Sequence, residues 1–213
     1  MKNKNYLFSR FARPALLGTL LSLTSPLPVQ NQELSSEYFL PEISHFTIAS
    51  PDTFLKVRKD GASGRVESIV SGFYQVFQES LPYLSPKILL SLVLQESSGD
   101  SLAVSNKGAR GLMQLTRSAW IDSGRREEDY LRMAKDPKEN VHAGLDYLIW
   151  IGDYCETTHP SWESLSDHDK RRLVLASYNG GSNRLKGKNW NIDRMPRETR
   201  MYVDDIENRA RYL

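Results

Sequence analysis

Apolar residues recur at intervals of three and four positions through most of the chain after residue 66, and this spacing limits the fold more than any other feature. Such intervals gather apolar side chains on one face of an α-helix, whereas half-buried strands need strict alternation, for which the sequence offers no convincing stretch. The predicted helices cover 66–80, Ser85-Pro86 to Gln95, parts of 116–135 with a break at Gly124, Asn140 to about Glu156, 168–178, and the residues after Pro196. We therefore predict a mostly α fold, with one compact helical domain over residues 66–213.

Residues 1–30 are arranged like a secretory signal. The segment opens with basic residues and contains no acid, then continues with a short apolar stretch from Ala15 to Leu23 and a polar stretch that includes proline. This order is typical of a signal peptide. No Ala-x-Ala-like triplet marks a cleavage site, so an uncleaved N-terminal anchor or a disordered tail is the alternative. The interpretation predicts an exported protein that is periplasmic or associated with the cell envelope.

Residues 31–65 are weakly patterned and interrupted by proline and glycine, so we interpret them as a variable N-terminal arm. No apolar run reaches the roughly 18 residues that a membrane-spanning helix needs, so we expect no stable span in the mature form. The formal net charge of +2 comes from the leader, because without its four basic residues the chain has 24 basic and 26 acidic residues. The sequence shows no basic cluster outside the leader, which argues against nucleic acid as a partner.

A single cysteine, Cys155, means that no internal disulfide can form. Its position after an apolar-rich stretch favours a packed core thiol over a nucleophile. The four histidines are scattered, and no set of cysteine and histidine residues has the spacing of metal ligands. We therefore predict neither a metal site nor a cofactor.

Glu96 is the residue whose place in the pattern points to chemistry. It follows three apolar residues at spacings of seven, four and three positions, so its carboxyl group shares the stripe that should face the core. Apolar surroundings and the negative end of a helix that stops before Gly99 would both raise the pKa of Glu96. A proton retained near neutral pH is what a general acid needs. On this helix alone, an outward and solvated Glu96 is the simpler interpretation.

Three further clusters have both a structural and a functional interpretation. The segment from Ser105 to Gln114 is a glycine-containing turn whose uncharged hydrogen-bonding groups suit sugar hydroxyl and acetamido groups. Tyr178 and Asn179 stand before two glycines, so they form either a helix C-cap or a sugar-stacking ring beside an amide. Residues 195–203 are typical of a helix that begins at proline, with an early glutamate favoured by the helix dipole.

Together these clusters resemble the soluble-lytic-transglycosylase-like (SLT) domain of the lysozyme superfamily, over roughly residues 84–207. Four motifs occur in the family's order, with a middle helix at 136–148 between the second and third. The four motifs are Gln95-Glu96-Ser97, the segment 103–114, the segment 176–181 and the segment 198–203. The nine-residue step from Glu96 to Ser105 also matches. Residues 99–102, 116–117 and 181–183 depart from the family's pattern, which leaves the fine substrate preference open more than the chemistry.

The resemblance implies a lysozyme-like α+β fold with a substrate groove, and an enzyme that acts on the glycan strands of peptidoglycan. The expected reaction cleaves the β-1,4 bond between N-acetylmuramic acid and N-acetylglucosamine and leaves a 1,6-anhydro end. Glu96 would be the catalytic acid and then base. By the same likeness, Ser105 and Gln114 would bind substrate near the acetamido group. Tyr178, Asn179 and Tyr202 would line the groove and orient Glu96.

Two alternatives stay open. Asp100, just past the helix of Glu96, could act as a second carboxyl group, which would make the protein a lysozyme-like muramidase, a hydrolase. A non-catalytic peptidoglycan-binding protein of the same fold is the other. The sequence identifies no partner in secretion, conjugation or phage assembly.

Overall fold

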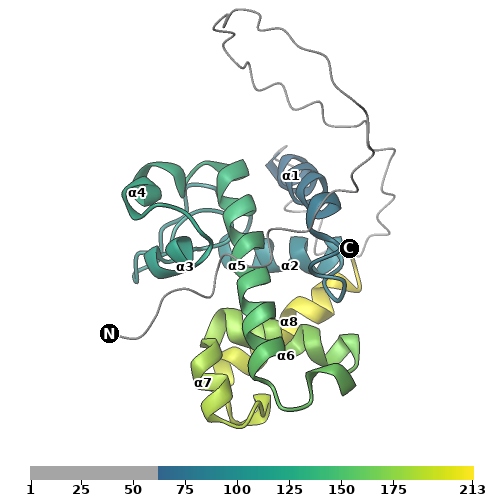
Figure 1. Ribbon diagram of the computed structural model, residues 1–213. Coiled ribbons are helices and arrows are strands. Elements are labelled where there is room, and N and C mark those ends of the chain that lie inside the picture. The colour runs from purple at the N-terminus through teal and green to yellow at the C-terminus, as the bar shows by residue number, and fades with distance from the viewer. Residues whose placement is uncertain (1–61) are drawn as a thin grey trace, which may run out of the picture. The chain divides into compact units, whose positions relative to one another are not determined.

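The computed structural model describes residues 62–213, and within them helices joined by loops make up the regular structure (Figure 1). The only β pairing in this part of the chain is a pair of isolated bridges, Val104 to Arg110 and Arg110 to Leu115. The helices are α1 (Ala62–Phe77), α2 (Pro86–Ser97), α3 (Arg117–Asp122), η2 (Glu127–Asp129), α4 (Tyr130–Met133), α5 (Pro137–Thr158), η3 (Trp162–Ser164), α6 (Asp167–Gly180), α7 (Ser182–Gly187), η4 (Ile192–Arg194) and α8 (Arg197–Ala210). The prediction of a mostly α domain is confirmed.

The predicted secretory signal and nearly all of the predicted arm lie outside the described residues. Helix α1 begins at Ala62, four residues before the start we predicted, and it ends at Phe77 rather than at residue 80. No helix within residues 62–213 is long and apolar enough to cross a bilayer.

Hydroxyl and carboxyl side chains fix where four of the helices begin. Ser85 accepts a hydrogen bond from the N–H of Ile88 at the start of α2, and Pro86 takes the first helical position, where a missing N–H costs nothing. Asp136 and Pro137 do the same for α5. Thr116 caps α3 and Ser166 caps α6 in the same manner. The start predicted at Ser85-Pro86 is therefore confirmed, whereas α5 begins at Pro137, three residues before the predicted start at Asn140.

Helix α5 is the central element of the core. It packs against α1 and α3 on one part of its length and against α6 and α7 on another, so it runs through the middle of the helices in Figure 1. Its inward face carries Leu145, Leu148 and Ile151, which are at most 1% exposed. Helix α2 packs against α8, although the two are far apart in the sequence.

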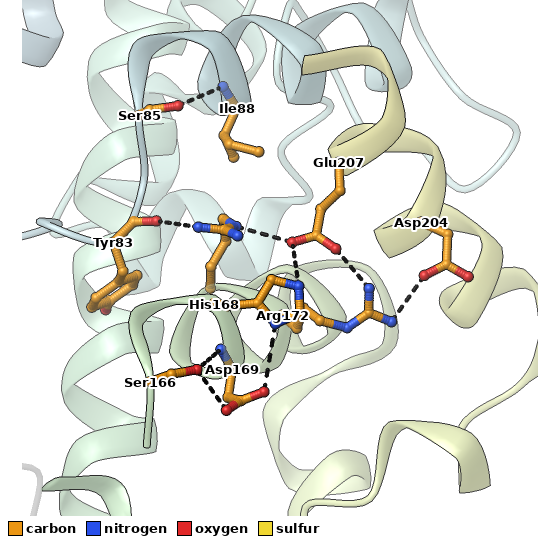
Figure 2. Close-up of polar contacts among 10 residues, drawn as sticks. Tyr83, Ser85, Ile88, Ser166, His168, Asp169, Arg172, Asp204 and Glu207 are labelled. Atoms are coloured by element: carbon orange, nitrogen blue, oxygen red, sulfur yellow. Dashed lines mark hydrogen bonds and ion pairs between the residues drawn. The ribbon is translucent and has the colours of Figure 1, made fainter. Parts of the chain in front are cut away.

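A network of charged side chains ties α8 to α6 (Figure 2). The buried carboxylate of Glu207 on α8 accepts hydrogen bonds from Arg171 at 3.0 Å and from Arg172 at 2.6 Å. Arg172 also donates to Asp204 at 2.8 Å. Charge-assisted bonds of this kind are stronger than neutral ones, and breaking a buried pair leaves an uncompensated charge. The network therefore fixes the position of α8 against α6.

Asn140, on α5, holds the turn between Arg110 and Leu115. Its Oδ1 accepts from the N–H of Met113 at 2.7 Å, and its Nδ2 donates to the carbonyls of Arg110 at 3.0 Å and Ala134 at 2.8 Å. Gly111 makes this approach possible, because its φ is +76° and an added Cβ would lie 2.2 Å from the oxygen of Ala134. The amide thus bonds to three backbone groups at once, and two of these hydrogen bonds are buried.

Candidate active site

Glu96 lies in the last turn of α2, where the helix leaves the core. The preceding turns bury Leu89, Leu92 and Val93, which are at most 1% exposed, and Glu96 continues their stripe. The chain then turns away, because Ser98 takes the left-handed conformation with a φ of 54° and its N–H bonds to the carbonyl of Leu94. Glu96 is partly buried, so the solvated alternative is wrong.

The carboxyl group of Glu96 meets a tyrosine from the far end of the chain. The hydroxyl of Tyr202, on α8, donates a hydrogen bond to Oε1 of Glu96 at 2.5 Å. Burial raises the pKa of Glu96 to about 7, and the hydrogen bond from Tyr202 lowers it in part by stabilising the carboxylate. Near neutral pH the group therefore populates both its acid form and its base form.

Two tyrosines adjoin Glu96 and stay neutral. Burial is the main cause that raises the pKa of Tyr202 well above 10, and the negative charge of Glu96 raises it further. The same two causes act on the pKa of Tyr178. Tyr178 donates its own proton to the carbonyl of Met113 at 2.6 Å, which joins α6 to the turn that Asn140 holds. Both rings are thus hydrogen-bond donors rather than bases.

The polar residues of the 105–114 turn bond to the turn itself. Gln114 has a φ of 45°, and its Nε2 donates to the carbonyls of Gly111 at 2.9 Å and Ala103 at 3.2 Å. The hydroxyl of Ser105 accepts from the N–H of Ala109 at 3.0 Å, and the residue is exposed. These bonds shape the turn, while the role of both residues toward substrate stays a prediction.

Asn179 and Asp100 lie at the surface. Asn179 is exposed in the last turn of α6, directly after Tyr178, and its contact with substrate stays a prediction. Asp100 is exposed as well, and its Oδ1 accepts a hydrogen bond from the N–H of Leu102 at 2.8 Å. Within residues 62–213, no charged group is among the causes of the Glu96 shift. The structure thus brings Glu96, Tyr178 and Tyr202 together.

Arg209 is a site-positioning residue that sequence reasoning missed. From α8 it donates to Oε1 of Gln95 at 2.9 Å and to the carbonyl of Ser91 at 3.1 Å. Both acceptors lie on α2, so this side chain holds together the two helices that carry Glu96 and Tyr202. Nothing in its sequence context distinguishes it from the other arginines of a basic, solvated helix end.

Cys155 has the environment expected of a core thiol. It is fully buried, its Sγ lies 3.7 Å from the hydroxyl of Ser177, and burial raises its pKa to about 11. A buried thiol with a raised pKa is chemically inert. In the described part of the chain, no group of three or more His, Cys, Asp or Glu side chains could hold a metal ion. The predicted lack of a cofactor stays a prediction.

The raised pKa of Glu96 predicts that stability depends on pH. The folded state binds this proton more tightly than the unfolded chain, so the stabilisation is complete below the ordinary value near 4.5 and is lost as the pH rises through about 7. Glu96→Gln removes this contribution to the pH dependence. We expect the variant to exceed the wild type by about 3 kcal/mol in unfolding free energy at alkaline pH, and to differ little at about pH 4.5.

Urea unfolding of both proteins across this pH range measures the effect. Glu163→Gln, at an exposed position of η3, is the matched control and should follow the wild type at every pH. A constant difference between Glu96→Gln and the wild type would contradict the assigned shift.

Comparison with known proteins identifies the family of this chain. A family model described as the transglycosylase SLT domain matches residues 75–199. The chain belongs to the SLT family. The matched segment contains Glu96, Ser105, Gln114, Tyr178 and Asn179, whereas Tyr202 lies three residues beyond its end. The family resemblance seen in the sequence is therefore confirmed.

Curated relatives share the SLT segment with this chain at low identity. The membrane-bound lytic murein transglycosylase F of Haemophilus influenzae (strain PittGG) is 24% identical over 70% of this chain and 27% of its own length. The protein of that name from Pectobacterium atrosepticum is 28% identical over 61% of this chain and 29% of its own length. The protein of that name from Pseudomonas fluorescens (strain Pf0-1) is 30% identical over 46% of this chain and 18% of its own length. The chain thus spans less than a third of the length of these relatives.

Proposed function

We propose that this protein is a peptidoglycan lytic transglycosylase, which cleaves the β-1,4 bond between N-acetylmuramic acid and N-acetylglucosamine and leaves a 1,6-anhydromuramic acid end. One observation carries the proposal: Glu96 is a partly buried carboxyl group whose pKa is raised to about 7 and whose Oε1 accepts from Tyr202. A general acid works best when its pKa is near the operating pH. Membership of the SLT family and the names of the relatives support the substrate.

The proposed reaction uses Glu96 twice. Glu96 first gives its proton to the glycosidic oxygen as the bond from that oxygen to C1 breaks, and the acetamido group of the muramic acid stabilises the positive charge at C1. The carboxylate then takes the proton of the O6 hydroxyl, whose oxygen attacks C1 and closes the anhydro ring. An attack from within the same sugar benefits from a high effective concentration and consumes no water. Glu96 ends the cycle protonated.

The neighbours of Glu96 suit both halves of this cycle. After the first proton transfer, the hydroxyl of Tyr202 stabilises the new carboxylate. Because burial keeps the pKa of Tyr202 well above 10, the tyrosine remains a donor and does not compete as a base. Tyr178 fixes the 105–114 turn through the carbonyl of Met113, and we propose that Ser105 and Gln114 bind the acetamido group from that turn. Asn179, directly after Tyr178 on α6, would contribute an amide to substrate binding.

A single carboxyl group distinguishes this reaction from ordinary glycoside hydrolysis, which uses two. Asp100, the candidate second group, is exposed and its Oδ1 already accepts a backbone N–H. These contacts favour the transglycosylase over the muramidase. We also propose that the protein acts at the cell envelope, where its substrate lies, and that residues 1–30 direct it there.

Mass analysis of the products separates the two reactions. Digestion of purified sacculi with the wild-type protein should release muropeptides that end in an anhydro ring, each lighter by one water than the hydrolysed equivalent. Products with reducing muramic acid ends would instead assign a hydrolase. A digest in which the protein binds sacculi without releasing fragments would support the non-catalytic alternative.

A further inference from the structure

A row of aromatic side chains lies along α5, and the proposed chemistry does not use it. Tyr147, Trp150 and Tyr154 are spaced by three and four residues, so they share one face of the helix. The ring centroids of Tyr147 and Trp150 are 5.7 Å apart at an interplanar angle of 13°, and those of Trp150 and Tyr154 are 6.0 Å apart at 19°. All three side chains are partly exposed. Between the first and the last, α5 rises by about 10 Å.

The inner end of the row adjoins the Glu96 site. The ring of Tyr147 lies 5.5 Å from that of Tyr178 at an angle of 58°. Tyr178 in turn is close enough to Glu96 for the carboxylate charge to raise its pKa. The partly exposed rings therefore continue from the candidate active site along α5 without a break.

The outer end of the row is held by strained backbone. Trp190 has a φ of 60° and Asn189 has a φ of 56°, a conformation that bulky side chains rarely adopt. Strain of this kind persists where the surrounding structure enforces it, and it concentrates at functional positions. In this conformation the Trp190 ring lies 6.4 Å from that of Tyr154. Tyr154 is fixed as well, since its hydroxyl donates to Asn183 at 2.7 Å.

Positive charge accompanies the outer rings. The ammonium group of Lys186 lies 5.6 Å from the centroid of the Tyr154 ring, and the neighbouring Arg184 and Lys188 are exposed. The peptide stems of peptidoglycan carry carboxylates, so a strand that follows the row would meet charges of the opposite sign. This complementarity favours peptidoglycan over an uncharged ligand as the occupant.

We propose that Trp150, Tyr154 and Trp190 bind sugar rings of the glycan strand at positions remote from the bond that Glu96 would cleave. The proposal rests on the function proposed above. One face of a hexose ring presents C–H groups, which stack on the negative face of an aromatic ring while the hydroxyl groups stay hydrated. The row adjoins Tyr178 at Tyr147 and continues along α5 to Tyr154, an arrangement that suits successive sugars of one strand. The site gives the enzyme a preference for long strands.

Binding to long strands tests the row independently of cleavage. In a chain that also carries Glu96→Gln, the double change Trp150→Ala/Tyr154→Ala is expected to raise the calorimetric Kd for long glycan strands about tenfold. In the active chain the same double change is expected to raise KM on long strands by a similar factor and to leave kcat unchanged. Glycan oligomers too short to extend beyond the Glu96 site should be bound and cleaved as by the wild type. Trp150→Phe/Tyr154→Phe keeps a ring at each position and should restore the affinity.

Two controls decide what the rings recognise. Tyr74→Ala removes a partly buried ring that lies on another helix, α1, and should leave the Kd for long strands unchanged. Strands stripped of their peptides should show the same loss with the double variant, because the rings contact sugars. The proposal is overturned if the double variant keeps the wild-type Kd, loses equally on short oligomers, or regains full affinity on stripped strands. Absence of cleavage by the wild type would refute the proposed function alone, since the binding comparison does not depend on turnover.

Discussion

Glu96→Gln is expected to lower the rate of muropeptide release from purified sacculi by about a thousandfold. The amide has nearly the shape of the acid, and its oxygen can still accept from Tyr202, so the domain should fold as before. An amide cannot give a proton to the glycosidic oxygen, however, and it cannot take one from the O6 hydroxyl. Both halves of the proposed reaction therefore fail together. Chromatography of the released fragments measures the rate, and circular dichroism reports the fold.

The matched control is Glu163→Gln, which makes the same chemical change at an exposed position of η3. It should release muropeptides at the wild-type rate. If Glu96→Gln did so too, Glu96 could not be the proton donor, and the proposed reaction would have to be given up.

A second large effect, on the unfolding free energy rather than on cleavage, is expected at Asn140. Asn140→Ala leaves the buried N–H of Met113 and the buried carbonyl of Ala134 without the partner that they have in the wild type, whereas the carbonyl of Arg110 still accepts from the N–H of Leu115. Each buried group left unsatisfied costs about 1–3 kcal/mol, so the unfolding free energy should fall by about 4 kcal/mol. That is a large fraction of the stability of an ordinary domain. Urea denaturation measures the loss.

Asn106→Ala is the control for this change, because Asn106 is exposed in the same turn region. Its unfolding free energy should stay within about 0.5 kcal/mol of the wild type. A loss below about 1 kcal/mol at Asn140 would mean that water or a shifted turn satisfies the N–H of Met113 and the carbonyl of Ala134.

The long helices could be predicted from the sequence because each buries a face wide enough to impose a period. Helix α5 has Leu145, Leu148 and Ile151 on that face, and its predicted extent differs from the observed one by only a few residues. Helix α7 and the short turns η3 and η4 were not predicted. They are three to six residues long, too short to show a period, and their conformation is set by packing on neighbouring helices.

The candidate site was predictable in part. The position of Glu96 follows from the apolar stripe of its helix, because a side chain on that stripe must be partly buried. Its pairing with Tyr202 could not follow from local sequence, since 106 residues separate the two. The hydrogen-bonding types of Ser105 and Gln114 suggested sugar contacts, but both side chains bond within their own turn. Residue type alone does not tell whether an amide binds a ligand or its own backbone.

The contact between α2 and α8 has a consequence for how the protein is made. Because Tyr202 follows Glu96 by 106 residues, Glu96 is synthesised well before the helix that encloses it. Until α8 docks, the carboxyl group is in water and keeps the acidity of a free glutamate. A chain in which α8 has not yet docked therefore lacks the raised pKa that suits Glu96 to donate a proton near neutral pH, so the proposed cleavage depends on the docking of α8.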